Sequence, residues 1–404
     1  MNVDYDVADE IKKFNETRLP ELVQFKYGFM AENLYRFFRG TSHLFHDQII
    51  DHKSIKSPLA WICGDLHLEN FGCYRGNNGL VYFDLNDFDE ALLGPITWEL
   101  SRVLTSIIIA FRTLAIGEDK ALKMTQLFLN SYSKTLTAGR PGFIERQTAK
   151  GIVRLVLRKA SHRSQDVILR KNTVLSTKGI KLNTERPKCF KLNKNTRHNV
   201  MTFAAEWLKE NTDGPYNYTV KDAAFRLAGT GSVGVKRYAI LLKSSNSNGE
   251  KFVILDMKQA MPSSSQHYFK KLQPKWRDEG ERIIAIQNRA QNVTPSLLST
   301  GIFDGIPFII EEMQPEKDSI DFQLIKNQYR DIYQVIDDMA MITASSHLRS
   351  SGRQGSAIAD ELIGFGEQKD WQGTLIDKAF DYANKIQVCY DRYCQAYTKG
   401  YFKK

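Results

Sequence analysis

The stretch that most constrains the fold of this 404-residue chain is 61–100, WICGDLHLENFGCYRGNNGLVYFDLNDFDEALLGPITWEL. An apolar lead-in runs into GDLHLEN, and a Gly/Asn turn then precedes a short apolar strand over 80–83. This strand is followed closely by three carboxylates, those of Asp84, Asp87 and Asp89. Carboxylate and carboxamide oxygens at strand ends are hard ligands, of the kind that hold Mg²⁺ on a phosphate substrate. The stretch therefore predicts a metal and phosphate site, and the alternative is a polar turn followed by a solvated acidic loop.

Two parts of this stretch resemble known catalytic segments. GDLHLEN, residues 64–70, resembles the catalytic loop of aminoglycoside and choline kinases, whose pattern is H-G-D-x-H-x-x-N. Residues 87–100 resemble the metal-binding Asp segment of those enzymes and the helix after it. The chain departs from the pattern at Cys63, which replaces the His that usually precedes Gly-Asp.

The resemblance implies a role for each polar residue of the stretch. Asp65 would orient or deprotonate the hydroxyl group that accepts a phosphoryl group. Asn70 and Asp87 would hold Mg²⁺, with Asp89 or Asp84 in support.

The chain as a whole is similar to the bacterial domain-of-unknown-function 2252 family, which is grouped with protein-kinase-like folds. The segments that carry this similarity are Phe38-Arg39-Gly40, 64–72, 86–95, 229–234 and 257–260. The similarity implies an α+β fold with two kinase-like lobes, and it supplies no substrate. It also suggests that Arg39 points toward the site, although a lone Arg at a helix end is more often a surface residue.

A glycine-rich segment, GTGSVG, occupies residues 229–234. A dinucleotide-binding loop of this pattern requires a helix directly after it. Here a β-branched and aromatic run follows, which predicts a hairpin between two strands. In kinases the backbone of such a loop lies over the nucleotide phosphates, and the residues expected to do so are Gly229, Gly231, Ser232 and Gly234. The alternative is a flexible hairpin tip.

The next strand, 251–257, ends in Lys258. In kinases a Lys on the third strand contacts the α- and β-phosphates and pairs with a Glu on the following helix. Lys258 has the order and the separation from the glycine-rich segment that this role requires. The following helix offers Glu281 as its partner, with Glu279 and Gln287 as competitors.

The rest of the chain is predicted to be mainly helical. Residues 308–313 predict a strand that enters a hinge, where backbone groups at Met313 would face adenine. Residues 169–192 predict a hairpin or loop. His347 lies on a helix and is expected to be structural. Apolar spacing predicts helices within 1–57 and over 96–114, 121–136, 143–159, 198–211, 280–291, 322–348 and 377–397.

The order of these motifs is the reverse of that in ordinary kinases, because GDLHLEN precedes the glycine-rich hairpin. If the resemblance holds, the chain is circularly permuted, which is tolerable when the termini lie at the surface. The predicted domains are a helical lobe with the catalytic and metal-binding loops over 1–215, a strand-rich nucleotide lobe over 216–316, and helices over 317–404 that complete the helical lobe. A boundary near 215 is marked by Asp213-Gly214-Pro215.

The net charge of +10 is concentrated in one segment. Residues 140–197 hold 16 Lys or Arg against 3 Asp or Glu, a net +13 that leaves −3 for the rest of the chain. Such a segment can attract nucleic acid or another anionic partner, or it can be a solvated basic surface. It has few aromatic residues for base stacking, which makes nucleic acid the less favoured partner.

Localisation and membrane contact are also predicted from composition. No apolar run approaches the length that spans a membrane, and the N-terminus is acidic and mixed, unlike a targeting segment. The five cysteines form no C-x-x-C pair and no metal spacing. These features predict a cytoplasmic protein with free thiols and no membrane partner.

The sequence thus predicts an ATP- and Mg²⁺-dependent phosphotransferase, with ATP between the two lobes and a small-molecule or protein hydroxyl as acceptor. Two alternatives use the same fold, a nucleotidyl (AMP) transferase and a nucleotide-binding pseudokinase. A third, of another class, is a protein that binds nucleic acid or an anionic partner through 140–197. The oligomeric state and the acceptor are not predicted.

Overall fold

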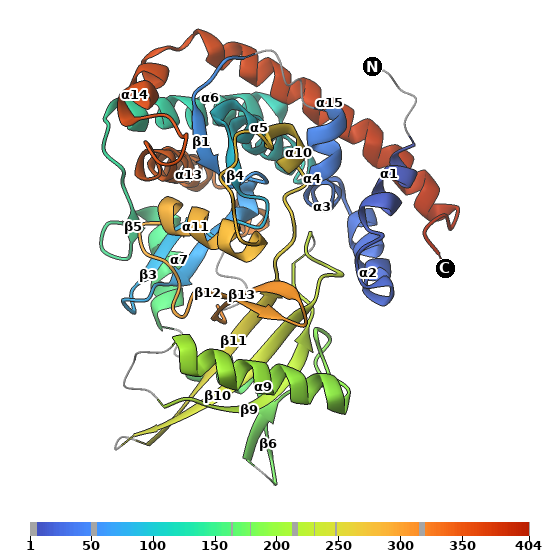
Figure 1. Cartoon of the computed structure of the whole chain (residues 1–404). Coiled ribbons are helices and arrows are strands. Elements are labelled where there is room, and N and C mark those ends of the chain that lie inside the picture. The colour runs from blue at the N-terminus through green and yellow to red at the C-terminus, as the bar shows by residue number, and fades with distance from the viewer. Residues whose placement is uncertain are drawn as a thin grey trace.

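The computed structural model describes residues 6–49, 55–162, 165–177, 179–211, 217–229, 231–246, 249–314 and 320–403. Its fold is α+β, with a large helical body above an antiparallel sheet in the orientation of Figure 1. The predicted boundary at Asp213-Gly214-Pro215, Thr230 of the glycine-rich segment and the end of the predicted domain at 316 lie outside the described residues.

The helical body is organised around α5, Ile96–Thr113, which is buried on all sides from Ile96 to Phe111. Its sequence has no continuous polar face, and a helix of this kind is stable only when other helices surround it. Helix α15, Asp370–Thr398, and helix α6, Glu118–Thr137, pack against it. Figure 1 shows α15 running along the upper edge to α1 and α2. The other helices of the body are α1 (Val7–Phe14), α2 (Pro20–Ala31), α3 (Leu34–Gly40), α4 (Ser42–Leu44), α7 (Gly151–His162), α10 (Gln266–Phe269), α11 (Glu279–Ala290), α12 (Phe322–Ile325), α13 (Tyr329–Arg349) and α14 (Ala359–Glu367).

Two small sheets are embedded in this body and carry the acidic stretch. Strand β1, Leu59–Ile62, pairs antiparallel with β4, Leu92–Pro95. A three-stranded sheet consists of β2 (Phe71–Arg75), β3 (Val81–Leu85) and β5 (Ile144–Glu145). Both sheets are nearly fully buried, so the loops between their strands are held on a rigid base.

The lower part of Figure 1 is a six-stranded antiparallel sheet in the order β12-β13-β11-β10-β9-β8. Its strands are β8 (Cys189–Phe190), β9 (Thr219–Arg226), β10 (Arg237–Asn246), β11 (Gly249–Gln259), β12 (Ser299–Phe303) and β13 (Ile306–Glu312).

Alternate side chains of β10 point to opposite faces of this sheet, as the two-residue period of a strand requires. Ile240 and Leu242 pack beneath α9, Lys194–Asn211, whereas Ala239 and Leu241 pack on the other face. That second face is covered by α8 (Gln165–Asn172) and the hairpin of β6 (Thr173–Ser176) and β7 (Gly179–Leu182).

Two boundaries differ from those predicted. The predicted domain edge at 215/216 does not separate the packing units, because α9 lies before it and packs on the sheet, while α11 lies after it and packs in the helical body. The predicted helix over 143–159 begins only at Gly151. The carboxylate of Glu145 accepts hydrogen bonds from the backbone N–H groups of Gln147 and Thr148, which stabilises a turn instead of a helix at 145–148.

Candidate functional site

A cavity lies where the acidic stretch, the glycine-rich loop and the end of β11 meet. Seven of the residues predicted as site residues line it: Asp65, Asn70, Asp87, Asp89, Gly231, Ser232 and Lys258. They come from chain segments that are more than 140 residues apart, since Ser232 and Asp89 are separated by 143 positions. The cavity therefore brings together the catalytic-loop motif, the acidic segment, the glycine-rich loop and the strand lysine.

The backbone on either side of Gly64 is held from two sides. The Oε1 atom of Glu99 accepts a hydrogen bond from the Cys63 N–H at 2.5 Å, and the ring Nε2 of His46 lies 2.9 Å from the Gly64 carbonyl oxygen. Gly64 has φ +79°, and a Cβ atom there would lie 2.1 Å from the Glu90 carbonyl oxygen. Only glycine fits this position, so the close approach of the Glu90 backbone explains why a glycine precedes Asp65 in the motif.

Glu99 belongs to a buried chain of polar groups behind the loop. Its Oε2 atom lies 2.6 Å from Nε2 of His347, and Nδ1 of His347 lies 2.7 Å from the Tyr132 hydroxyl. The side chains of His347 and Glu99 are 0% and 1% exposed. His347 is therefore a structural residue that positions Glu99, and through Glu99 the catalytic-loop motif.

Asp65 faces the cavity and is bound by a buried arginine. Arg102 on α5 donates from Nε to Oδ1 of Asp65 at 2.8 Å and from Nη2 to the Phe38 carbonyl at 2.8 Å. Its guanidinium group lies 3.5 Å from the centre of the Phe38 ring. Burial raises the pKa of Asp65 to about 6 even though Arg102 lowers it. An acid with a pKa in this range can give or take a proton near neutral pH.

The acidic segment and the strand lysine contact each other directly. Lys258 forms an ion pair with Asp89, and the backbone N–H of Asp89 donates to Oδ1 of Asp87 at 3.3 Å. Burial raises the pKa of Asp87, and the Asp89 carboxylate raises it further. Burial by itself lowers the pKa of Lys258, but Asp89 and Asp87 raise it above its ordinary value. The arrangement is an array of one cation and two carboxylates at the cavity wall.

Asn70 completes the set of oxygen atoms. It lies at the end of a 3₁₀ turn, Leu68–Asn70, and its Nδ2 donates to the Asp65 carbonyl oxygen at 2.7 Å. This bond uses the amide nitrogen and leaves the amide oxygen as the atom able to bind a cation. Within the described residues there is no cluster of three or more His, Cys, Asp or Glu side chains that could hold a metal ion. A metal here would therefore rely on Asn70 and on further ligands from a substrate.

The glycine-rich loop joins β9 to β10, which pair antiparallel, so the predicted hairpin is confirmed. Arg18, between α1 and α2, donates from Nη1 to the carbonyl oxygens of Gly231 at 2.6 Å and Val233 at 2.7 Å. The Ser232 hydroxyl lies 3.5 Å from Oδ2 of Asp89. A Cβ atom on Gly234, which has φ +93°, would lie 2.9 Å from the Arg18 side chain. The loop is therefore held against the helical body.

The predicted pairing of Lys258 with Glu281 does not form in the structure. Glu281 lies in the first turn of α11 and pairs with Arg277 at 3.2 Å, and it also accepts the Arg277 backbone N–H. The residue of α11 that approaches the acidic segment is Arg282, which donates to the Asp89 carbonyl oxygen at 2.9 Å. Packing of the apolar face of α11 into the helical body places Arg282, not Glu281, on this side.

Three other predicted site residues lie outside the cavity lining. Gly229 and Gly234 occupy the two ends of the glycine-rich loop, where both have positive φ. The backbone N–H of Met313 donates to the Ile254 carbonyl oxygen at 2.8 Å, and its side chain is buried in the core of the sheet. The Met313 N–H group, which was predicted to face adenine, is therefore already hydrogen-bonded within the sheet.

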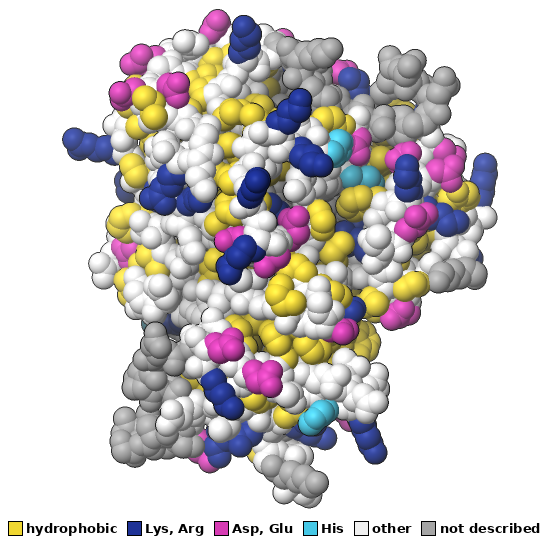
Figure 2. Space-filling model, in the orientation of Figure 1, with side chains coloured by type: hydrophobic (Ala, Val, Ile, Leu, Met, Phe, Trp, Pro, Cys, Tyr) yellow, Lys and Arg dark blue, Asp and Glu magenta, His cyan; other side chains and the backbone are white. Residues whose placement is uncertain are grey.

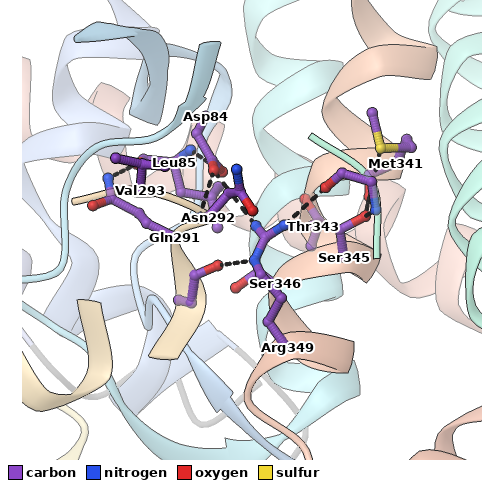
Figure 3. Close-up of polar contacts among 12 residues, drawn as sticks. Asp84, Leu85, Gln291, Asn292, Val293, Met341, Thr343, Ser345, Ser346 and Arg349 are labelled. Atoms are coloured by element: carbon purple, nitrogen blue, oxygen red, sulfur yellow. Dashed lines mark hydrogen bonds and ion pairs between the residues drawn. The ribbon is translucent and has the colours of Figure 1, made fainter. Parts of the chain in front are cut away.

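Asp84 is buried on β3 and does not line the cavity. Figure 3 shows it facing Arg349 of α13, whose Nη2 lies 3.4 Å from Asp84 Oδ2. Arg349 also donates to the carbonyl oxygens of Ala290 at 2.7 Å and Gly142 at 2.8 Å. Gln291 donates to the Leu85 carbonyl oxygen at 2.6 Å in the same network. Asp84 therefore joins β3 to α11 and α13, and the structure gives it a structural contact where the sequence predicted support for a metal.

Several residues of the cavity were not predicted. Arg18, Lys26 and Glu90 line it, and Arg102 lies directly behind Asp65. Arg39, by contrast, is the residue that the family resemblance suggested would point toward the site, and it lines the cavity and donates from Nε to His67 Nε2 at 3.2 Å. An arginine on the otherwise apolar helix that follows the motif was a usable signal for Arg102. Nothing in the local sequence distinguishes Arg18 and Lys26 from surface residues.

The basic segment predicted over 140–197 is spread over α7, α8 and the β6–β7 hairpin. On the face shown in Figure 2, Lys and Arg side chains lie on both parts of the molecule and are interspersed with Asp and Glu. Within the described residues, no helix is both long enough and apolar enough to cross a membrane.

Comparison with known proteins identifies a family that covers most of the chain. Residues 18–396 match the family described as "Uncharacterized protein conserved in bacteria (DUF2252)". The chain belongs to this family. The match to the DUF2252 family covers every residue that lines the cavity except Phe14. No curated protein and no solved structure matches the chain.

Proposed function

We propose that this DUF2252 protein is an ATP- and Mg²⁺-dependent phosphotransferase with a circularly permuted, kinase-like arrangement of two lobes. The observation that carries the proposal is the ion pair of Lys258 with Asp89 inside a cavity that also holds Asp65 and the glycine-rich loop. These groups are far apart in the chain and in the reverse of the usual kinase order. Their meeting in one cavity is what a permuted kinase fold requires, because a site depends on geometry and not on chain order.

The donor set is compatible with Mg²⁺. Asn70 offers an amide oxygen, and Asp87 and Asp89 offer carboxylate oxygens at the same cavity, which are the hard ligands that Mg²⁺ uses together with substrate phosphates. Burial and the Asp89 carboxylate raise the pKa of Asp87 although Lys258 lowers it, and a cation bound beside Asp87 would favour its ionised form. A bound Mg²⁺ would supply charge neutralisation on the phosphate groups.

The residues of the cavity would then have separate roles in the reaction. The ammonium group of Lys258 and the backbone N–H groups of the glycine-rich loop bind the phosphates. Asp65 orients the acceptor hydroxyl and takes its proton, and Arg102 holds the Asp65 carboxylate in place through Oδ1. Since phosphoryl transfer needs mainly positioning and charge stabilisation, these groups suffice for the reaction class.

The test is calorimetric titration of ATP with and without Mg²⁺ into the wild type, Asp87→Asn and Asp377→Asn. Asp377 is an exposed aspartate on α15 and serves as the matched control. Removal of a charge that contacts the metal should weaken Mg²⁺-dependent binding by about tenfold or more in Asp87→Asn only. Absence of binding at millimolar ATP, or equal binding by all three proteins, would overturn the proposal. ATP labelled at the α- or the γ-phosphate then distinguishes nucleotidyl transfer from phosphoryl transfer by the label found in the product.

A further inference from the structure

The wall of the cavity formed by the N-terminal helices carries two cations without a carboxylate partner. Lys26 on α2 is 0% exposed, lines the cavity and donates from Nζ to the amide oxygen of Asn15 at 3.0 Å. Arg18 lines the cavity too and donates only to the carbonyl oxygens of the glycine-rich loop. No ion pair joins either of them to an acid within the described part of the chain.

Four acids line the cavity, Asp65, Asp87, Asp89 and Glu90, and in the described part of the chain none of them forms an ion pair with Arg18 or Lys26. Asp65 is bound by Arg102, and Asp89 by Lys258. Glu90 accepts hydrogen bonds from the Ser264 N–H at 2.6 Å and from the Ser264 hydroxyl at 2.8 Å. Glu90 and Asp89 attract Arg18, and Glu90 and Asp65 attract Lys26, but neither cation forms a direct ion pair with an acid in the described part of the chain, so a direct contact with an anion in the cavity is open to both.

Such a pair of cations is costly to keep without a ligand. A buried ammonium group has lost its hydration, and a single amide oxygen replaces only part of it. Burial lowers the pKa of Lys26 well below its ordinary value, and the neighbouring Arg18 lowers it further. Both cations lie near one aromatic ring, because Lys26 Nζ and the Arg18 guanidinium are 5.3 and 5.4 Å from the centre of the Phe14 ring. Phe14 itself is stacked on His43 at 3.8 Å, which holds the ring in place.

We propose that Arg18 and Lys26 form an anion-binding subsite for the acceptor, which is a small molecule that carries a phosphate or carboxylate group besides its reacting hydroxyl. This inference rests on the proposed phosphotransferase function and narrows its substrate class. The phosphates of ATP are expected to bind Lys258 and the backbone N–H groups of the glycine-rich loop, which leaves these two cations for a second anion. Lys26 lines the same cavity as Asp65, the residue expected to meet the acceptor hydroxyl, and the Asp65 charge acts on it.

The test uses sodium sulfate as the probe, because sulfate is a tetrahedral dianion that does not titrate near neutral pH. Calorimetric titration at constant ionic strength compares the wild type with Lys26→Met, Arg18→Gln and the control Asp377→Asn, each with and without saturating ATP and Mg²⁺. Loss of one charged hydrogen bond should weaken sulfate binding by about tenfold in Lys26→Met and in Arg18→Gln, and leave the control unchanged. Sulfate affinity should persist when ATP is bound.

Each of the other outcomes has a defined meaning. Lys26→Met keeps the length of the side chain and removes a buried charge, so it should fold, and thermal unfolding checks this. Absence of sulfate binding, or binding unchanged in Lys26→Met and Arg18→Gln, would overturn the subsite. Displacement of sulfate by ATP would assign the two cations to the nucleotide phosphates and overturn the acceptor assignment. Sulfate binding by a protein that binds no ATP would overturn the phosphotransferase proposal, and with it the acceptor, while the anion site itself would stand.

Discussion

Asp65 should reduce the stability of the folded protein at neutral pH, and its replacement by Asn should increase it. Its side chain is 18% exposed, and burial, opposed by Arg102, raises its pKa from 3.8 to about 6. An acid with a raised pKa binds its proton more tightly in the folded state. The loss of folding stability caused by ionised Asp65 is therefore absent below the pKa that Asp65 has in the unfolded chain. It grows as the pH rises toward the pKa of Asp65 in the folded protein, and it is complete above that pKa.

The size of this stability change follows from the pKa shift of Asp65. A rise from 3.8 to about 6 corresponds to about 3 kcal/mol. Partial solvent access reduces this figure, so we expect a gain of about 1–3 kcal/mol for Asp65→Asn at a pH near 7.5. The Asn side chain has the same shape, can still accept the hydrogen bond from Arg102 Nε through its amide oxygen, and cannot ionise.

Urea unfolding of the wild type, Asp65→Asn and the exposed control Asp377→Asn at about pH 7.5 and about pH 4 measures this gain. The stability difference between Asp65→Asn and the wild type should be present at the higher pH and nearly vanish at the lower one. The control should show neither effect. A variant that is less stable than the wild type at both pH values would refute the reasoning, because it would mean that attraction by Arg102 outweighs burial.

Two further predictions concern the polar contacts behind the site. His347→Leu leaves the buried Glu99 carboxylate without its ring partner and should lower the free energy of unfolding by about 3–5 kcal/mol, while Tyr132→Phe, which removes only the outer hydrogen bond, should cost about 1 kcal/mol. Equal losses of unfolding free energy in the two variants, measured by urea unfolding, would contradict the assignment of His347 as the direct partner of Glu99 and of Tyr132 as the outer one. Arg349→Met removes the partner of buried Asp84 and should cost about 3 kcal/mol near pH 7. Burial already raises the Asp84 pKa, so this loss should shrink as the pH falls and the acid protonates, and a loss independent of pH would argue against the ion pair.

Much of the fold could be predicted from local patterns. The glycine-rich segment followed by a β-branched run gave the hairpin of β9 and β10, and the apolar run after Pro95 gave the central helix α5. These elements depend on neighbouring residues, whose spacing is visible in the sequence. The start of α7 was missed because a side chain, that of Glu145, stabilises a turn in competition with the helix.

The polar motifs of the cavity were likewise identified from their order and spacing, but their partners were not. The sequence places Asp65 in a catalytic-loop pattern, yet only the packing of α5 brings Arg102 to it. Lys258 was expected to pair with Glu281, but Glu281 pairs with Arg277, and Lys258 pairs with Asp89 of the acidic segment.

What the sequence by itself determined is therefore the set of chemical groups and the local elements that carry them. The tertiary structure decided which groups are buried and which charges face one another, and so the raised pKa of Asp65 and the lowered pKa of Lys26. The physical reason is that periodicity and turn chemistry act over a few residues, whereas an ion pair depends on the relative placement of helices that are distant in the chain. His347 and Glu99, 248 positions apart, are the clearest example.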